Sequence, residues 1–243
     1  MEQHSQSVKL MGNNFVITVV TENEAQAKIQ IAFAIEEIQR IERLLTTFKS
    51  DSQTNLINEN AGIRPVKVDV EVIDLIERSI AISHLTQGAF DITYGSIDKT
   101  LWNFDKTMTQ LPDAVTAKKM VHLINYENII LDKSNHTVFL KEKGMRIGFG
   151  GIGKGYAAEM AKNVLLKNNV QSGIINASGD LTAWGNQANG KAWTIGVANP
   201  DTPTAAFSYL EISNMAVATS GNYEKYILID GKKYSHTIDP KTG

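Results

Sequence analysis

The C-terminal part of the chain gathers residue types that can move a proton and hold a phosphate. His236 shares a predicted strand end with Asp239, and both follow a turn that carries the hydroxyls of Thr219 and Ser220. A histidine titrates near neutral pH, so a histidine beside hydroxyl groups can act as a general base. A lone histidine is more often a surface residue or a satisfied core residue, and we interpret the other four histidines in that way. The surroundings of His236 favour a catalytic role.

A second candidate is the glycine-rich segment 146–159, with the sequence RIGFGGIGKGYAAE. Glycines let the backbone approach a ligand, and a helix N-terminus favours an anion. The spacing does not match a dinucleotide fingerprint, and Lys154 is not followed by Ser or Thr as in a Walker loop. Both an anion-binding turn and a purely structural turn are consistent with this segment.

Two shorter segments place polar groups next to glycines. Residues 88–95 put Phe90 and Asp91 between two glycines, which suits a flat ring ligand but also an ordinary corner of the fold. Asp180 follows a predicted buried strand and can orient a ligand hydroxyl or bond to its own turn.

The elements that must position these residues follow from hydrophobic periodicity. Apolar residues at steps of three and four predict helices over 24–48 and 70–86, separated by a polar loop over 49–62. Pro112 predicts the start of another helix, and a further helix is expected over 156–167. The predicted strands span 14–20, 129–131, 137–140, 145–149, 173–177, 193–197, 206–212, 215–218, 225–229 and 233–238. Their short connections indicate antiparallel pairing.

Composition excludes several function classes. The 243 residues are 42% hydrophobic and 21% charged, as in an ordinary globular protein, and the formal net charge is -2. Without a basic tract, binding to nucleic acid has no electrostatic support. The absence of cysteine excludes disulfides, thiolate metal sites and a cysteine nucleophile. No apolar run is long enough to span a membrane, and the N-terminus has no signal-peptide core or lipid-attachment cysteine.

Taken in the order in which they occur along the chain, these segments resemble the ApbE family, the FAD:protein FMN transferases. The matching segments are 11–13 (MGN), 50–58 (SDSQTNLIN), 88–93 (GAFDIT), 151–157 (GIGKGYA), 177–180 (ASGD), 218–223 (ATSGNY) and 236–243 (HTIDPKTG). The departures from the family pattern are Asn13 for Thr, Asn55 for Ser, Ile92 for Pro and Ser178 for Gly. No single motif is decisive, but their order and spacing along nearly the whole chain are highly specific.

The resemblance implies an α+β fold in which antiparallel sheets are backed by helices, with a T-fold-like, two-lobed architecture and a central cleft. We expect one domain over residues 1–243 and a natural protein that continues beyond Gly243. The resemblance places such a protein in the periplasm or on the outer face of the cytoplasmic membrane, with a cytoplasmic protein as the alternative.

The implied activity is transfer of FMN from FAD to a threonine hydroxyl of a target flavoprotein, with release of AMP and a requirement for Mg²⁺. Two alternatives remain open. One is an FAD pyrophosphatase that produces AMP and FMN, and the other is a non-catalytic FAD-binding protein. The acceptor protein and the oligomeric state do not follow from the sequence.

The resemblance also assigns site residues. The positions expected near FAD are Met11, Phe48, Asn58, Ala89, Phe90, Asp91, Gly150, Tyr156, Asp180, Ser220 and Ile238. His236 is the expected general base, with Asp239 and Thr219 as candidates to orient it. The backbone carbonyl of Gly153 is the expected metal ligand. The family's other ligands, an Asp and a Thr, come from a segment after the D-P-x-T-G motif, so we expect the metal site to be incomplete within these 243 residues.

Overall fold

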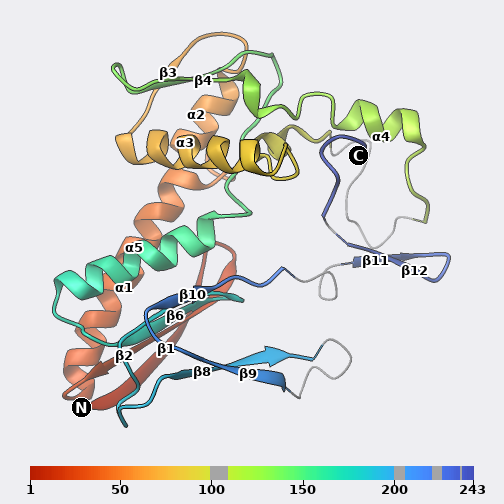
Figure 1. The fold of residues 1–243 in the computed structure, drawn as a ribbon. Coiled ribbons are helices and arrows are strands. Elements are labelled where there is room, and N and C mark those ends of the chain that lie inside the picture. Colours follow the sequence, from red (N-terminus) through yellow and green to blue (C-terminus); the bar gives the residue numbers. More distant parts are fainter. Residues whose placement is uncertain (99–108, 200–205, 221–225, 236) are drawn as a thin grey trace. The chain divides into compact units, whose positions relative to one another are not determined.

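The computed structural model describes residues 1–98, 109–199, 206–220, 226–235 and 237–243 (Figure 1). The chain divides into two compact units. Unit 1 comprises Met1–Arg43 and Ile152–Ser220, and unit 2 comprises Leu44–Gly151 and Gly221–Gly243. All strand pairs among the described residues are antiparallel, and helices accompany the sheets, which confirms the predicted α+β class.

Unit 1 is built on a five-stranded sheet with the order β1-β2-β6-β7-β10. The strands are β1 (Glu2–Leu10), β2 (Asn13–Thr21), β6 (Gly173–Ala177), β7 (Asp180–Trp184) and β10 (Met215–Val217). Helix α5 (Gly153–Lys167) packs against β6 and β7. Helix α1 (Glu24–Leu45) begins in this unit, and the Gln30 side chain donates to the Asn168 carbonyl just after α5. The buried apolar residues of α1 recur at steps of three and four, as predicted: Ala27, Ile31, Ala34, Ile38, Ile41 and Leu45.

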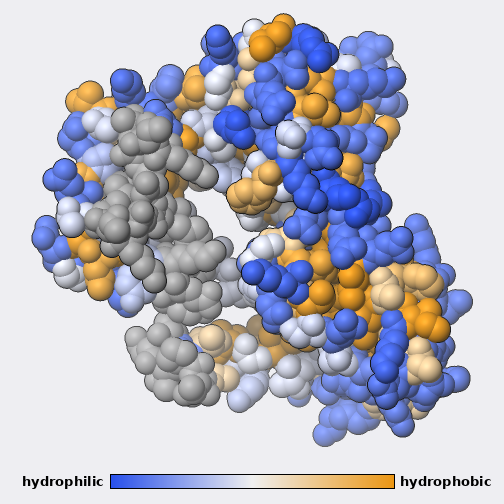
Figure 2. Space-filling view, turned by 180° about the vertical axis from the view of Figure 1, so that it is seen from behind, coloured by the Kyte–Doolittle hydropathy of each residue, from blue (hydrophilic) through white to orange (hydrophobic). Residues whose placement is uncertain are grey.

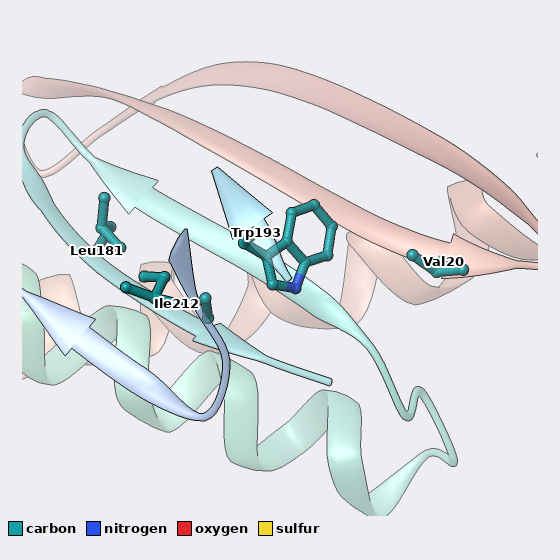
Figure 3. Packing of buried hydrophobic residues seen from close by; sticks show 5 residues of the cluster. Val20, Leu181, Trp193 and Ile212 are labelled. Atoms are coloured by element: carbon teal, nitrogen blue, oxygen red, sulfur yellow. The ribbon is translucent and has the colours of Figure 1, made fainter. Parts of the chain in front are cut away.

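The opposite face of this sheet is covered by the hairpin of β8 (Trp193–Ala198) and β9 (Ala206–Ile212). Figure 3 shows Trp193 and Ile212 of the hairpin beside Val20 and Leu181 of the sheet, which with Ala183 form one buried cluster. The Trp193 indole N–H donates to the Trp184 carbonyl at 3.1 Å. The only polar atom of the Trp193 side chain therefore has a hydrogen-bond partner inside the core. Unit 1 therefore has helices on one face of the sheet and a hairpin on the other.

Unit 2 is richer in helix. Its elements are α2 (Gln53–Glu59), β3 (Val66–Lys67), α3 (Val70–Leu85), the 3₁₀ helices η1 (Ile92–Ser96) and η2 (Tyr126–Asn128), α4 (Ala114–Met120), β4 (Ile129–Asp132), β5 (Thr137–Leu140), β11 (Tyr226–Ile229) and β12 (Lys232–Ser235). The strands form a three-stranded sheet, β3-β5-β4, and the separate β11–β12 hairpin. A core cluster joins the end of α4 to this hairpin through Met120, Val121, Ile227 and Ile229.

The last residues of the chain form a turn held by Asp239. Its carboxylate accepts from the backbone N–H groups of Lys241, at 2.7 Å, and Thr242, at 3.2 Å, while its carbonyl accepts from Gly243 N–H at 2.9 Å. Gly243 has φ of +78° and lies so close to the Ala117 backbone of α4 that a side chain would not fit. The turn is thus tied to α4 by a close approach that requires glycine.

The face shown in Figure 2 is mostly hydrophilic, and hydrophobic residues occupy only parts of it. The exposed apolar side chains of unit 1 include Phe207 and Tyr209 of β9 and Met215 of β10. In the part of the chain that the structure describes, no helix is both long and apolar enough to cross a membrane.

Two sequence-based predictions of local structure are wrong. Residues 49–62 are not a loop, because they contain α2, which is capped by Ser52 through a bond from Asn55 N–H at 3.1 Å. Its buried side chains include Thr54, Asn55 and Asn58, so its inward face is polar and lacks hydrophobic periodicity. Residues 145–149 are not a strand. Two of their backbone N–H groups donate to the side chains of Ser96 and Asn58, and not to a neighbouring strand.

Other boundaries and elements also differ from the predictions. The helix predicted from Pro112 begins at Ala114, with Asp113 as its N-cap. Strands β1, β3 and β7 were not predicted. Strand β1 is polar on most of its length, β3 has only two residues, and β7 follows directly on a two-residue turn. The remaining predicted helices and strands are found within a few residues of their expected bounds where the structure describes them.

Candidate functional site

In unit 1, two tight turns lie at one end of the five-stranded sheet. Met11 and Gly12 connect β1 to β2 with φ of 50° and 71°, and Ser178 and Gly179 connect β6 to β7 with φ of 56° and 101°. Positive φ at both central residues is the signature of the tightest hairpin turns. The Ser178 hydroxyl accepts from Asn14 N–H at 3.2 Å and donates to the Asn14 carbonyl at 2.9 Å. These bonds fix the two turns to each other.

The hydroxyl-bearing segment after β10 reaches the same end of the sheet. Strand β10 pairs with β7, with Val217 opposite Leu181, and Thr219 and Ser220 follow as exposed residues. A Cβ atom placed on Gly179 would lie 3.6 Å from Thr219 Cβ. The predicted site residue Thr219 therefore lies directly beside the turn that precedes Asp180.

The N-terminus of α5 adds positive charge to this group. The Lys154 ammonium lies 3.4 Å from an Asp180 carboxylate oxygen, and both side chains are mostly buried, with exposures of 24% and 19%. The first N–H groups of a helix have no partner within the helix and carry the positive end of its dipole. Ile152, the N-cap residue, provides no side-chain cap, and the first turn holds no acidic residue. An anion such as a phosphate is the group that this arrangement suits.

Other polar side chains of α5 take part in a neighbouring network. Glu159 accepts from the buried Thr182 hydroxyl at 3.0 Å and pairs with Lys162 at 2.5 Å. Tyr156, predicted to lie near FAD, is half-buried one turn into the helix. Unit 1 thus brings together six of the predicted site residues at the sheet end and the first turn of α5: Met11, Gly153, Tyr156, Asp180, Thr219 and Ser220.

In unit 2, Asp91 is the centre of a buried hydrogen-bond network. One carboxylate oxygen accepts from Thr93 N–H at 2.8 Å and from the Thr93 hydroxyl at 2.6 Å, and the other accepts from Tyr126 N–H at 2.9 Å. The Thr93 hydroxyl in turn accepts from Asn125 N–H at 2.9 Å. Burial raises the pKa of Asp91, and the bonds from Thr93 and Tyr126 partly oppose this rise. Asp91 joins the 88–96 segment to the loop before β4.

The neighbours of Asp91 differ in exposure. Ala89 is exposed, whereas the half-buried Phe90 ring lies 3.5 Å from where a Cβ on Gly151 would be. An aromatic ring therefore lies beside the glycine turn within unit 2, and its contact with a ligand stays a prediction. Gly150 itself is exposed and donates its N–H to the Tyr94 hydroxyl at 2.9 Å.

The remaining predicted site residues of unit 2 differ in their contacts and in their exposure. The Asn58 side chain is buried and bonds to both backbone polar groups of Ile147, at 2.7 Å and 3.0 Å. Phe48 is 96% exposed. Ile238 packs, half-buried, against the α4–hairpin core cluster, and the Asp239 carboxylate is engaged in its own turn. His236, the predicted base, lies outside the described residues.

Sequence reasoning missed two residues that the structure makes prominent, Lys154 and Tyr94. Lys154 was compared with the Walker pattern and included in the family motif at 151–157, but it was not assigned a role, although its place just before a predicted helix was a signal for anion binding. Tyr94 gave no signal of its own, because its contact with Gly150 joins segments that are 56 positions apart in sequence.

The predicted metal site has one candidate ligand here. The Gly153 carbonyl belongs to the first residue of α5. No group of three or more His, Asp or Glu side chains able to hold a metal ion occurs among the described residues.

Comparison with known proteins identifies the relatives of this chain. A family model described as the ApbE family matches residues 11–243. A FAD:protein FMN transferase of Klebsiella pneumoniae (strain 342) is 33% identical over 241 residues, which cover 99% of this chain and 73% of the relative. The crystal structure of the ApbE protein of Thermotoga maritima is similar with a TM-score of 0.88 and 30% identity, covering 99% of this chain and 77% of the other. The apo flavinyl transferase ApbE of Pseudomonas stutzeri is similar with a TM-score of 0.84 and 25% identity, covering 99% and 75%.

Proposed function

Because this chain belongs to the ApbE family, we propose that it transfers FMN from FAD to a threonine hydroxyl of a target flavoprotein and releases AMP. The observation that carries this proposal is the 33% identity, across 99% of the chain, to a relative named FAD:protein FMN transferase. The grouping of Lys154, Asp180 and Thr219 beside the N-terminus of α5 supports it, since the reaction needs a site for phosphate groups.

The proposed reaction breaks one bond and forms one. The acceptor hydroxyl oxygen attacks the phosphorus of the FMN half of FAD, and the bond from that phosphorus to the bridging oxygen breaks. AMP leaves with the bridging oxygen and its electron pair, and the proton of the hydroxyl passes to a base. Positioning and neutralisation of charge supply most of the catalysis in phosphoryl transfer.

Within this scheme, Lys154 and the first N–H groups of α5 neutralise phosphate charge, and the hydroxyls of Thr219 and Ser220 bond to phosphate oxygens. The Asp180 carboxylate holds the Lys154 ammonium at the end of the sheet. Phe90, beside Gly151, is a surface for the flat flavin or adenine ring.

A requirement for Mg²⁺ is part of the proposal and is supported by the family resemblance alone. Mg²⁺ prefers an octahedron of oxygen ligands that includes carboxylates. The described residues offer the Gly153 carbonyl but no cluster of acidic side chains, so they do not form the site by themselves. The roles given to the other residues do not depend on the metal.

Product analysis tests the proposed function. The protein is incubated with FAD, Mg²⁺ and a flavoprotein that carries FMN on a threonine, prepared in its unmodified form, with the Thr→Val variant of that acceptor as control. We expect AMP release that equals the FMN bound to the acceptor, and no modification of the variant. AMP and free FMN in equal amounts with either acceptor would indicate a pyrophosphatase. FAD bound but left intact would indicate a carrier.

We further propose His236 as the general base. The acceptor hydroxyl is a poor nucleophile at neutral pH, and a neutral imidazole can take its proton as the new bond forms. His236→Ala should lower FMN transfer by roughly a hundred- to ten-thousand-fold while FAD binding changes little. The exposed His122 is the matched control, and His122→Ala should transfer at the wild-type rate. Transfer by His236→Ala within about threefold of wild type, far below that range, would exclude the base.

A further inference from the structure

The segment that leads to the glycine turn is fixed by side chains instead of by a sheet. Arg146 N–H donates to the Ser96 hydroxyl at 2.8 Å, and this hydroxyl donates to the Arg146 carbonyl at 3.1 Å. The Asn58 amide makes the equivalent pair of bonds with Ile147. Gly148 N–H donates to the Ile92 carbonyl at 2.9 Å. A backbone without strand partners needs such bonds when it is buried. These contacts fix the path of the chain up to Gly148.

Tyr94 continues this support to the turn itself. Its hydroxyl accepts from Gly150 N–H at 2.9 Å. A Cβ atom on Gly148 would lie 3.0 Å from the Tyr94 hydroxyl oxygen, and one on Gly150 would lie 2.5 Å from it. The phenol therefore occupies the space that a side chain at either position would need.

The backbone angles show why this contact matters. Neither Gly148 nor Gly150 is among the described glycines with positive φ, so their conformations do not by themselves require glycine. The close approach of the Tyr94 hydroxyl is the structural reason for the missing side chain at Gly150. Desolvation of the Tyr94 hydroxyl raises its pKa, and the bond from Gly150 N–H opposes this rise.

We propose that Tyr94 is a positioning residue for the proposed transfer of FMN, since it fixes Gly150 and the turn that carries Gly151 next to Phe90. This inference rests on the proposed function, in which the turn contacts FAD. Because Gly150 N–H is donated to Tyr94, Gly150 offers a ligand its Cα and carbonyl instead of a phosphate-binding N–H group.

A double-mutant cycle between Tyr94 and Gly150 tests this proposal. Tyr94→Phe removes the acceptor of Gly150 N–H, and we expect KM for FAD to rise by about two- to tenfold, the value of one hydrogen bond, with kcat within about twofold. Gly150→Ala places a methyl group 2.5 Å from the hydroxyl oxygen, and KM should rise more than about tenfold. In the Tyr94→Phe background, the nearest Tyr94 ring carbon is 3.6 Å away, so Gly150→Ala should add less than about a threefold change.

Tyr209→Phe, on the exposed face of β9, is the matched control and should change neither constant. The same cycle is measured by urea unfolding, which reports the contact without any activity. The proposal is overturned if Tyr94→Phe leaves KM for FAD unchanged, or if Gly150→Ala is equally harmful with Tyr94 and with Phe. A wild-type protein that binds no FAD would remove the proposed function, and with it the positioning role, even where urea midpoints show the coupling.

Discussion

In the proposed function, Lys154 is the side chain of unit 1 that neutralises phosphate charge. It combines a cation with the positive end of α5, and Asp180 holds it in place. We predict that Lys154→Met lowers FAD affinity by about 10- to 100-fold, because a charged hydrogen bond contributes about 1.5–3 kcal/mol. Titration of flavin fluorescence measures this change, and the affinity of the variant should depend less on salt.

A matched control for Lys154 lies on the same helix. Lys162 lies two turns beyond Lys154 on α5 and forms an ion pair with Glu159. The Lys162→Met variant removes the same charge as Lys154→Met. Affinity for FAD should stay near the wild-type value in this variant. Equal losses in both variants would mean that total charge, and not the position of Lys154, determines binding.

The family motifs name candidate site residues, but they do not show what those residues touch. The sequence placed Asn58 and Asp91 near the ligand, and the structure shows their polar atoms bonded within unit 2 to Ile147, Thr93 and Tyr126. A contact of either residue with FAD stays a prediction. The partner of a polar side chain depends on which distant segment lies alongside it, and one sequence does not contain that information.

At the level of elements, hydrophobic periodicity predicted α1 and α3 well because each buries one apolar face. The same signal failed for α2, whose buried residues are largely polar and are satisfied by hydrogen bonds. It also failed for residues 145–149, whose apolar residues alternate as in a strand but whose backbone bonds to Asn58 and Ser96. Periodicity reports burial, so it does not distinguish a strand from an extended segment held by side chains.

Two glycines of unit 1 should respond to alanine in opposite ways. A Cβ on Gly173 of β6 would lie 2.6 Å from the Trp184 ring and 2.7 Å from the Thr18 carbonyl, whereas one on Gly155 of α5 meets nothing within 4 Å. Gly173→Ala should lower the free energy of unfolding by about 1–3 kcal/mol through overpacking. Gly155→Ala should raise it by about 0.5–1 kcal/mol through helix propensity. Urea unfolding of both variants checks this, and a stable Gly173→Ala protein would contradict the packing.

For the whole molecule, composition fixed the broad class and little more. A net charge of -2 gives no long-range attraction for FAD, whose phosphates are negative, so we expect binding to depend on local groups such as Lys154. The family resemblance implied two lobes, but the boundaries of the two units did not follow from the sequence, because each unit is assembled from two separate stretches of chain. Neither a linker nor a change of composition marks those boundaries.

The whole-molecule consequence of the proposed function is that FAD stabilises the folded protein. A ligand that binds only the native state adds about 2.7 kcal/mol at a concentration 100 times its dissociation constant. For a chain of this length, that corresponds to a rise in Tm of about 5–10 °C. The His236→Ala variant should show the same rise, because the base is not needed for binding, and Lys154→Met should show a smaller rise at equal FAD. Thermal unfolding with and without FAD separates these outcomes. An unchanged Tm at millimolar FAD would show that this chain does not bind the substrate of its relatives, since a site with even a ~10 μM dissociation constant would then be saturated 100-fold.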